Sequence, residues 1–401
     1  MRDATAEFRD RELRAEARSG RARKFSIKDI EFADLLADNL KFSAVGDTIN
    51  LSAQSGRARS FSSKDYNLQN VAGRNVRIKN RGKETHVDIN GLTAAGGEIR
   101  GVKARRVTAD TLSVVDVPRT TDITAKNLRV EQLDVKGAHV DGLTAASAEL
   151  ENVTDGPLTV YSDSVRVAKI DTGSAVLGSL NIGGVRMTIR QGRVEARSDD
   201  IDAGNVTLAK TKTLPDGGNL ESVKIVKPVY ILEPSGRYRV TADMSIGGGA
   251  VGSVALGAAK AKVEADNNRV ALNELTADVM EGQLNGRAVI ALNNRSSSTL
   301  NGNFTNLDIA KIIALSGGGI TPIEGQTTGR VDLTFAGTNF RNASGTLGAN
   351  ITANAGSTDS GLIPVNGELK LSATNGLFSI DVANLRTDKS TLTASGRFDL
   401  K

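Results

Sequence analysis

The chain has 401 residues, which would make two or three ordinary domains unless it is built from repeats. Apolar residues make up 39% of it, but aromatic residues only 3%, with no Trp. This composition favours a thin β-structure filled by Val, Ile, Leu and Ala over the bulky core of a compact enzyme. The absence of Cys excludes disulfide frameworks, thiol nucleophiles and Cys-based zinc or iron–sulfur sites.

Charge is unevenly distributed along the chain. Residues 1–130 carry about 25 basic and 17 acidic side chains, whereas residues 301–401 are near neutral. The basic runs at 18–24 and 100–106 lack neighbouring aromatic residues on which bases could stack, and acidic residues are interleaved nearby. We therefore expect no nucleic-acid binding, and a solvated face or a weak contact with anionic lipid head groups instead.

No apolar stretch approaches the roughly 20 residues that span a bilayer, and the start of the chain is too charged for a signal peptide. We expect either a soluble protein or a piece of a protein that is anchored elsewhere.

The N-terminal third contains two periods. The pentapeptide SGRAR occurs at 19–23 and again at 55–59, an offset of 36 residues. A shorter period runs through the same third of the chain. Apolar residues recur every five positions, most clearly from Ile123 to Val153, and most have a second apolar residue two places further on. Pairs at i and i+2 that restart every five residues predict very short strands joined by bends, because a helix would need a spacing of 3.6.

This pattern resembles pentapeptide-repeat proteins, whose chain coils into a four-sided β-helix. The order of small and large residues that such repeats prefer is broken at Leu143 and Ala145. The alternative is a long sheet of short irregular strands in which the spacing is a coincidence.

From about residue 160 the pattern becomes plain alternation, as in segments 329–336 and 346–354. One face of each predicted strand is apolar and the other is polar, which is typical of antiparallel sheets. The dipeptides Asn375-Gly376, Asp216-Gly217 and Asn366-Gly367 predict tight turns. One helix is predicted at 307–315, where it would cap or plug an edge or end of the sheet.

Residues suited to catalysis are scarce. The segment 247–252 fits the G-x-G-x-x-G pattern, but its flanks predict neither a buried parallel strand nor a helix, so we expect no dinucleotide. His86 and His139 have no partner at metal-ligand spacing, and Asp199, Asp200 and Asp202 are more typical of a solvated turn than of a cation site. We expect no catalytic residues, metal or cofactor, and therefore no enzyme.

The C-terminal half contains five weak motifs in a characteristic order: GQLNGRA at 282–288, NLDIAKII at 306–313, GRVDLTFAG at 329–337, GTLGANITANAG at 345–356 and STLTASGRFDL at 390–400. In the order of these motifs, about residues 160–401 resemble the AsmA/TamB family of bacterial envelope proteins. Members of the family begin with a membrane anchor, which we expect in a segment outside this chain, and the five-residue pattern of the N-terminal third is not a family feature.

The resemblance implies an all-β fold, an elongated antiparallel sheet folded lengthwise into a groove (a β-taco) that carries lipid. We expect a short-strand, solenoid-like section at 1–160 and the groove at 161–401. The residues predicted to line the groove are apolar and alternate with polar neighbours: Val331, Leu333, Phe335, Leu347, Ile351, Leu369, Leu371, Phe378, Ile380, Leu392 and Phe398.

The function implied is non-enzymatic phospholipid transport between membranes, in support of outer-membrane biogenesis. The expected partners are phospholipid acyl chains, membranes at one or both ends and other envelope proteins. The expected location is the periplasm or cell envelope, with an inner-membrane anchor in a segment outside this chain. The alternative is a structural β-solenoid, a scaffold or adhesin-like rod without a ligand.

Overall fold

The computed structural model describes residues 2–27, 30–62, 66–99, 102–135, 137–211, 217–251, 254–293, 295–315, 322–337, 339–353 and 362–399. It consists almost wholly of β-strands, which confirms the predicted fold class. Every strand except β22 and β25 belongs to antiparallel sheet, and these two form a separate parallel pair. The chain divides into two compact units: residues 1–203 with 231–234 (unit 1), and residues 204–230 with 235–401 (unit 2).

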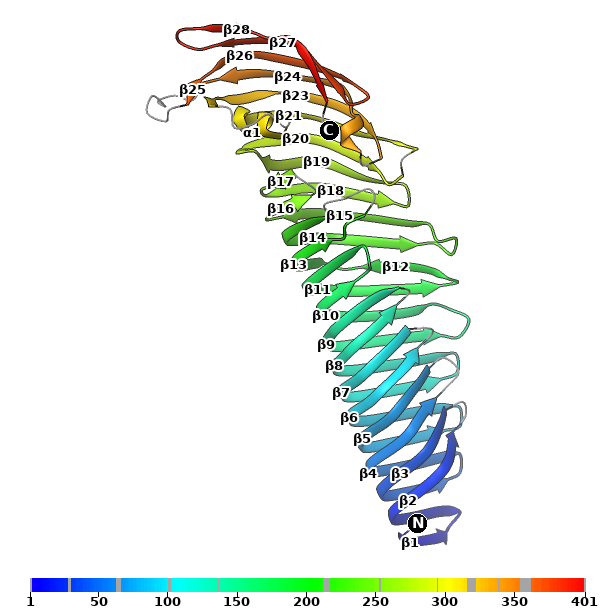
Figure 1. Cartoon of the computed structure of the whole chain (residues 1–401). Coiled ribbons are helices and arrows are strands. Elements are labelled where there is room, and N and C mark those ends of the chain that lie inside the picture. Colours follow the sequence, from blue (N-terminus) through cyan, green and yellow to red (C-terminus); the bar gives the residue numbers. More distant parts are fainter. Residues whose placement is uncertain are drawn as a thin grey trace. The chain divides into compact units, whose positions relative to one another are not determined.

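Unit 1 is a ladder of hairpins in which each strand pairs with the next along the chain (Figure 1). Its strands are β1 (Arg2–Arg9), β2 (Glu12–Ile27), β3 (Ile30–Val45), β4 (Thr48–Ser62), β5 (Tyr66–Arg81), β6 (Glu84–Ile99), β7 (Val102–Val117), β8 (Thr120–Val135), β9 (Ala138–Val153), β10 (Leu158–Asp171), β11 (Ala175–Arg190) and β12 (Arg193–Arg197). Turns at one end of the ladder lie at 46–47, 82–83 and 118–119, which are 36 residues apart. The 36-residue duplication is therefore one complete hairpin with its two turns.

The strands of unit 1 are much longer than the five-residue period predicts. Strands β2 to β9 have 15 or 16 residues each, so the expected bends lie inside continuous strands and do not separate short ones. In β3 the bends coincide with Asp34 and Asn39, whose φ angles are 49° and 50°. A left-handed residue interrupts the alternation of side chains, so the buried side resumes one residue later.

This interruption accounts for the period of five. In β3, Phe32 and Ala37 are buried on the same side although they are five positions apart, an odd spacing that would put them on opposite sides of a regular strand, because Asp34 lies between them. Asn, Asp and Gly adopt the left-handed region at the lowest cost, and they supply most of the bends. The other left-handed residues within strands β5 to β11 are Asn70, Asn75, Gly91, Arg106, Asn127, Gly142, Ser179 and Gly184.

The core of unit 1 lies on one face of the bent strands, which we call the inner face. Residues paired across successive strands form rows along this face, and the centre of one such row is Val87, of which 3% is exposed. The row runs over eight strands: Phe42, Leu51, Ile78, Val87, Val114, Ile123, Leu150 and Val160. Rows of β-branched and aliphatic side chains on a common face stabilise the pairing of neighbouring strands.

Unit 2 contains mostly shorter strands, in which the alternation is plain except near the left-handed residues Ser222, Lys227, Glu274 and Asn306. They are β15 (Tyr238–Ile246), β16 (Gly248–Val251), β17 (Val254–Leu256), β18 (Ala259–Asp266), β19 (Arg269–Val279), β20 (Gly282–Ala291), β21 (Ser297–Asp308), β22 (Ile323–Glu324), β23 (Gln326–Ala336), β24 (Ser344–Thr352), β25 (Ile363–Pro364), β26 (Asn366–Thr374), β27 (Leu377–Arg386), β28 (Thr391–Thr393) and β29 (Gly396–Asp399), with a 3-10 turn at Phe340–Asn342. Strands β13 (Asp200–Leu208) and β14 (Gly218–Leu232) supply residues to both units.

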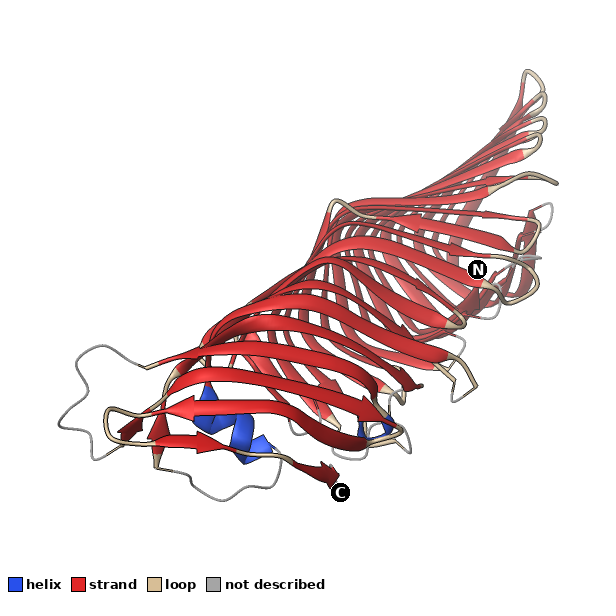
Figure 2. Cartoon of the chain, turned by 90° about the horizontal axis from the view of Figure 1, so that it is seen from above, coloured by secondary structure: helices blue, strands red, loops and turns tan. Residues whose placement is uncertain are grey.

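The predicted helix is present as α1 (Ile309–Leu315), directly after β21. Asp308 accepts a hydrogen bond from the backbone N–H of Ala310 at 2.8 Å, which satisfies one of the free donors at the helix start. Figure 2 shows the strands of unit 2 arching, with α1 on their concave side. Ile309 is buried there, so the helix covers part of this concave face, which we call the inner face of unit 2.

The three predicted turns have different outcomes. Asn375 and Gly376 form the β26–β27 turn, and both have positive φ, as a type I′ hairpin requires. Asp216 lies outside the described residues. The prediction of a turn at Asn366-Gly367 is wrong, because both residues lie within β26. There a Cβ on Gly367 would come within 2.0 Å of the Asn384 carbonyl oxygen, so glycine permits close packing of the backbones and not a turn.

Candidate functional site: the apolar inner face of unit 2

Strand register brings the predicted lining residues of unit 2 together. Val331 pairs with Leu347, which pairs with Leu371, and Leu371 in turn pairs with Ile380. Paired residues in an antiparallel sheet point to the same face, so these four side chains form one row. Leu333 lies two residues beyond Val331 on the same face and is 3% exposed.

The same face carries Phe335, Leu369 and Phe378. Phe335 and Phe378 are buried, and Leu369 packs against the buried cluster. Phe398 pairs with Phe378 across β27 and β29, but its side chain lies outside the described residues. The inner face is thus continuous from β20 to β27.

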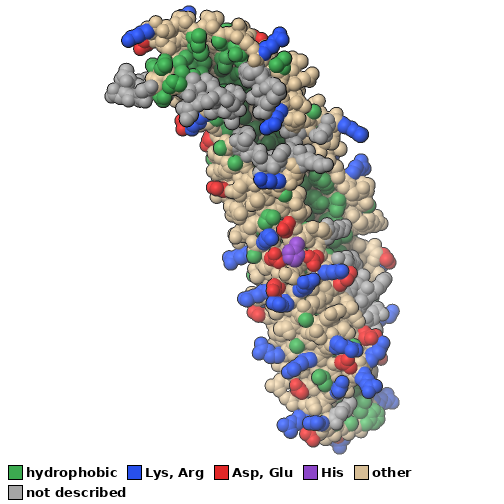
Figure 3. Space-filling model, viewed as in Figure 1, with side chains coloured by type: hydrophobic (Ala, Val, Ile, Leu, Met, Phe, Trp, Pro, Cys, Tyr) green, Lys and Arg blue, Asp and Glu red, His purple; other side chains and the backbone are tan. Residues whose placement is uncertain are grey.

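Exposure of the inner face increases towards β28. Ile351 pairs with Gly367, Gly367 with Leu385, and Leu385 with Leu392. Ile351 is 4% exposed, Leu385 is half-buried, and Leu392 is 58% exposed. In Figure 3, hydrophobic side chains gather on the concave side of strands β23, β24 and β26. An apolar surface that begins in the core therefore reaches solvent at β28.

The opposite face of the same strands is polar. Lys370 lies 2.6 Å from Glu368, and Asp332 accepts a hydrogen bond of 2.6 Å from the Asn301 amide. Asp381 accepts one of 3.0 Å from the Ser372 hydroxyl. The one-residue alternation between an apolar and a polar face is the distribution expected from the sequence.

Several residues of the inner face were not predicted. Phe304 and Ala343 are buried in the same cluster, with Ala349 and Ala373. Phe304 could have been found, because Leu300, Gly302 and Phe304 alternate with polar residues. Ala343 follows a 3-10 turn at Phe340–Asn342, and no periodic pattern in the sequence indicates its burial.

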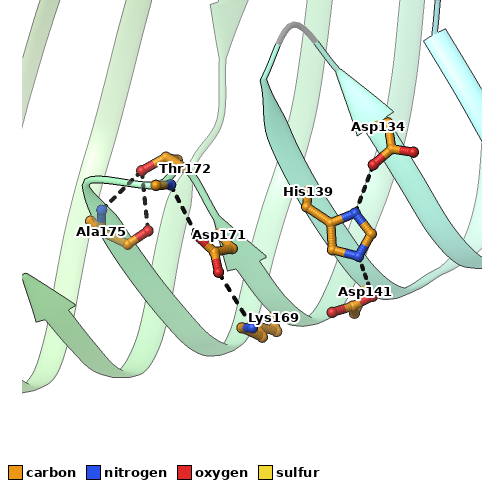
Figure 4. A network of polar contacts seen from close by, with 8 residues as sticks. Asp134, His139, Asp141, Lys169, Asp171, Thr172 and Ala175 are labelled. Carbon is orange, nitrogen blue, oxygen red and sulfur yellow. Dashed lines mark hydrogen bonds and ion pairs between the residues drawn. The ribbon is translucent and has the colours of Figure 1, made fainter. Parts of the chain in front are cut away.

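The most organised polar cluster lies on the outer face of unit 1, around His139 (Figure 4). His139 Nδ1 lies 2.7 Å from Asp134 Oδ1, and Nε2 lies 3.0 Å from Asp141 Oδ1. The register also pairs Asp171 with His139, and Lys169 lies 3.5 Å from Asp171. Both ring nitrogens can donate only in the imidazolium form, so the arrangement favours a charged ring.

The pKa values agree with that arrangement. The hydrogen bond to Asp134 raises the pKa of His139, and the charges of Asp141 and Asp134 act in the same direction against partial desolvation. The same hydrogen bond lowers the pKa of Asp134. His139 is partly exposed and its two nitrogens point to different carboxylates, so the cluster is an ion-paired surface brace across three strands.

The glycine-rich segment, which the sequence offered as a candidate site, has a structural role. Gly248 and Gly249 of the glycine-rich segment lie in β16, where Gly249 packs against the backbone of Asn219. Within the described ranges, no group of three or more His, Asp or Glu side chains is placed to hold a metal ion. Among the same residues, no helix is both long and apolar enough to cross a membrane.

Comparison with protein-family models, with curated proteins and with solved structures gave no match.

Proposed function

We propose that this chain is a non-enzymatic lipid-binding protein that holds acyl chains on the inner face of unit 2. The observation that carries this proposal is the row from Ile351 to Leu392, along which an apolar face leaves the core and becomes exposed. A sheet with one apolar face must bury that face against another layer or against a ligand. The exposed end of the row is the place where an acyl chain would enter.

The energetics support a lipid ligand. Each buried methylene contributes about 0.8 kcal/mol, so a chain of about 15 methylenes gains on the order of 12 kcal/mol. The inner face offers aliphatic side chains of similar character along its length, and the row from Ile351 to Leu392 consists of apolar residues and one glycine. Many equivalent contacts would allow an acyl chain to slide along the face.

The resemblance to AsmA/TamB proteins supports a wider role. It favours phospholipid transport between the membranes of a bacterial envelope and a contribution to outer-membrane biogenesis, with the protein in the periplasm. The weak motifs that carry it lie in unit 2, on strands that form the inner face and, for the motif at 306–313, at the end of β21 and in α1 beside that face, which links the two arguments.

One observation favours the alternative of a closed structural rod. The middle of the inner face is filled by protein: Val331, Leu333 and Ile351 are each less than a tenth exposed. If the inner face closed in the same way as far as β28, it would hold no ligand. A test must therefore examine the half-buried and exposed residues and not the central ones.

Site-specific photo-crosslinking in cells provides that test. A photoreactive side chain would replace Leu371, Leu385 or Leu392 on the inner face, and Lys370, Asn384 or Asp381 on the outer face as matched neighbours. We expect lipid adducts, detected by mass spectrometry after organic extraction, at the first three positions and few at the second three. Equal labelling of both sets would contradict the inner-face assignment. Absence of lipid adducts from a folded protein would favour the closed rod.

A further inference from the structure

The duplicated SGRAR pentapeptide places two arginines on either side of β3. Arg21 pairs with Leu36, and Leu36 pairs with Arg57, so the two arginines flank one leucine on the outer face of unit 1. Their neighbours Ala22 and Ala58 point inward, and Ala58 is buried. Both side chains are therefore directed towards solvent, from backbone positions about 10 Å apart, because one strand lies between them.

The same row continues along the outer face through β10. We call it the arginine row, and its members in strand order are Arg21, Leu36, Arg57, Ala72, Thr93, Thr108, Arg129, Thr144 and Arg166. Basic residues occupy four of its positions, all on even-numbered strands, and uncharged residues occupy the others. The row contains no acidic residue.

The arginines of the row differ from other arginines of unit 1. Arg59 lies 3.1 Å from Asp34, and Arg14 lies 2.6 Å from Glu12. In contrast, Arg21, Arg57, Arg129 and Arg166 are exposed and form no ion pair with any described residue. No described carboxylate therefore lies within ion-pairing distance of these four arginines.

A shallow concavity surrounds the first pair of arginines. It has a volume of about 430 Å³, and Arg2, Arg21 and Arg57 line it together with Ser19, Leu36 and Asp38. Asp38 is its one acidic residue and accepts a hydrogen bond of 2.7 Å from Ser55. Leu36 is 49% exposed at the centre. The concavity thus combines three guanidinium groups with an apolar floor.

This combination indicates a phosphate-bearing partner with an apolar layer beneath its charges. A guanidinium group binds phosphate through two parallel hydrogen bonds. A linear polyanion such as single-stranded nucleic acid would need aromatic side chains for stacking, and the arginine row has none. An exposed leucine between arginines suits the boundary between head groups and acyl chains.

We propose that the outer face of unit 1 docks on the phosphate head groups of an anionic membrane through the arginine row. This face is opposite to the buried one, so the proposal is independent of lipid binding inside unit 2. Each basic residue near an anionic surface strengthens binding by about fivefold, so four of them contribute on the order of 100-fold or more. Because the attraction is electrostatic, it weakens as the salt concentration rises.

The test uses the full chain and vesicles of phosphatidylcholine containing about one third phosphatidylglycerol. The variant R21Q/R57Q/R129Q/R166Q should lose on the order of 100-fold in vesicle affinity, measured by co-sedimentation, with an unchanged circular dichroism spectrum. A matched control, R14Q/R59Q/R193Q/R197Q, removes the same charge from arginines that are already ion-paired. It should retain binding within a few fold.

Three results would overturn the proposal. The first is absence of vesicle binding by the unchanged chain, and the second is an equal loss in both variants, which would show that only net charge matters. The third is row-dependent binding of soluble inorganic polyphosphate without binding of vesicles, which would assign the row to a soluble polymer. The row variant should still give lipid adducts at Leu392 if the inner face of unit 2 binds lipid, so the two proposals can fail separately.

Discussion

Units 1 and 2 build the same kind of surface by different means. In unit 1, strands of about 16 residues bend at left-handed residues, and the buried side is restored after each bend. In unit 2, strands such as β23 and β24 have 9 to 11 residues and alternate in the simple way. The comparison shows that a period of five and a period of two have the same meaning, namely one apolar face, and differ only in whether the strand bends.

The largest expected effect comes from placing a charge in either core. Val87→Asp in unit 1 and Leu333→Asp in unit 2 each bury a carboxylate among apolar side chains, since both residues are 3% exposed. We expect each change to reduce the free energy of unfolding by about 4 kcal/mol or more. Hydrogen exchange should show loss of protection in the unit that carries the change.

The neighbouring outer-face substitutions Asp88→Ala and Thr334→Ala serve as controls and should change stability by less than about 1 kcal/mol. If Val87→Asp removed protection from unit 2 as completely as from unit 1, the two units would unfold together, and the prediction that they unfold separately would be wrong.

A smaller effect is expected at the left-handed bends inside the long strands of unit 1. Asn75 in β5 has a φ of 50°, and a β-branched residue is strained in this region. Asn75→Val should reduce the free energy of unfolding by about 1 to 2 kcal/mol, measured by urea denaturation, whereas Asn75→Gly should be nearly neutral.

Asn67 lies in the same strand, is also exposed, and has no positive φ. Asn67→Val should be neutral or slightly stabilising, because valine favours extended backbone. If both valine substitutions had the same effect, the left-handed residues would not be the cause of the five-residue period.

The five-residue pattern predicted the buried side of unit 1 but not the length of its strands. Phe32 and Ala37 could be assigned to the core from spacing alone, since only the side that they face matters. The distinction between a bend inside a strand and a break between strands depends on whether the φ angle changes at one residue or the hydrogen-bonded ladder stops. Asp34 and Asn39 are compatible with both, because Asp and Asn favour turns as well as left-handed positions.

For the candidate site, alternation was sufficient where strands are regular. Val331, Leu333 and Leu347 were assigned correctly to one face because a period of two fixes the direction of each side chain. Alternation does not predict exposure, and Leu392 has the same pattern as Leu333 although it lies at β28 and is largely exposed. The arginine row could not be predicted, because it depends on which residues are opposite one another across nine strands.

The smallest expected effect is a pH dependence of unit 1 that arises from His139. The hydrogen bond and charge of Asp134, with the charge of Asp141, raise the pKa of His139 in the folded chain. A group whose pKa is higher in the folded state than in the unfolded state stabilises the fold below the unfolded pKa, about 6.5 for histidine, and this contribution is lost as the pH rises through the folded pKa. Asp134→Asn should therefore lower the pKa of His139, measured by NMR of its ring protons, and should destabilise the chain more at pH 5 than at pH 8.

Asp122→Asn, a change on the outer face of the same strand β8, serves as the control and should leave the pKa of His139 unchanged. If the pKa of His139 were unchanged in the Asp134→Asn variant, the cluster would not brace β8 against β9.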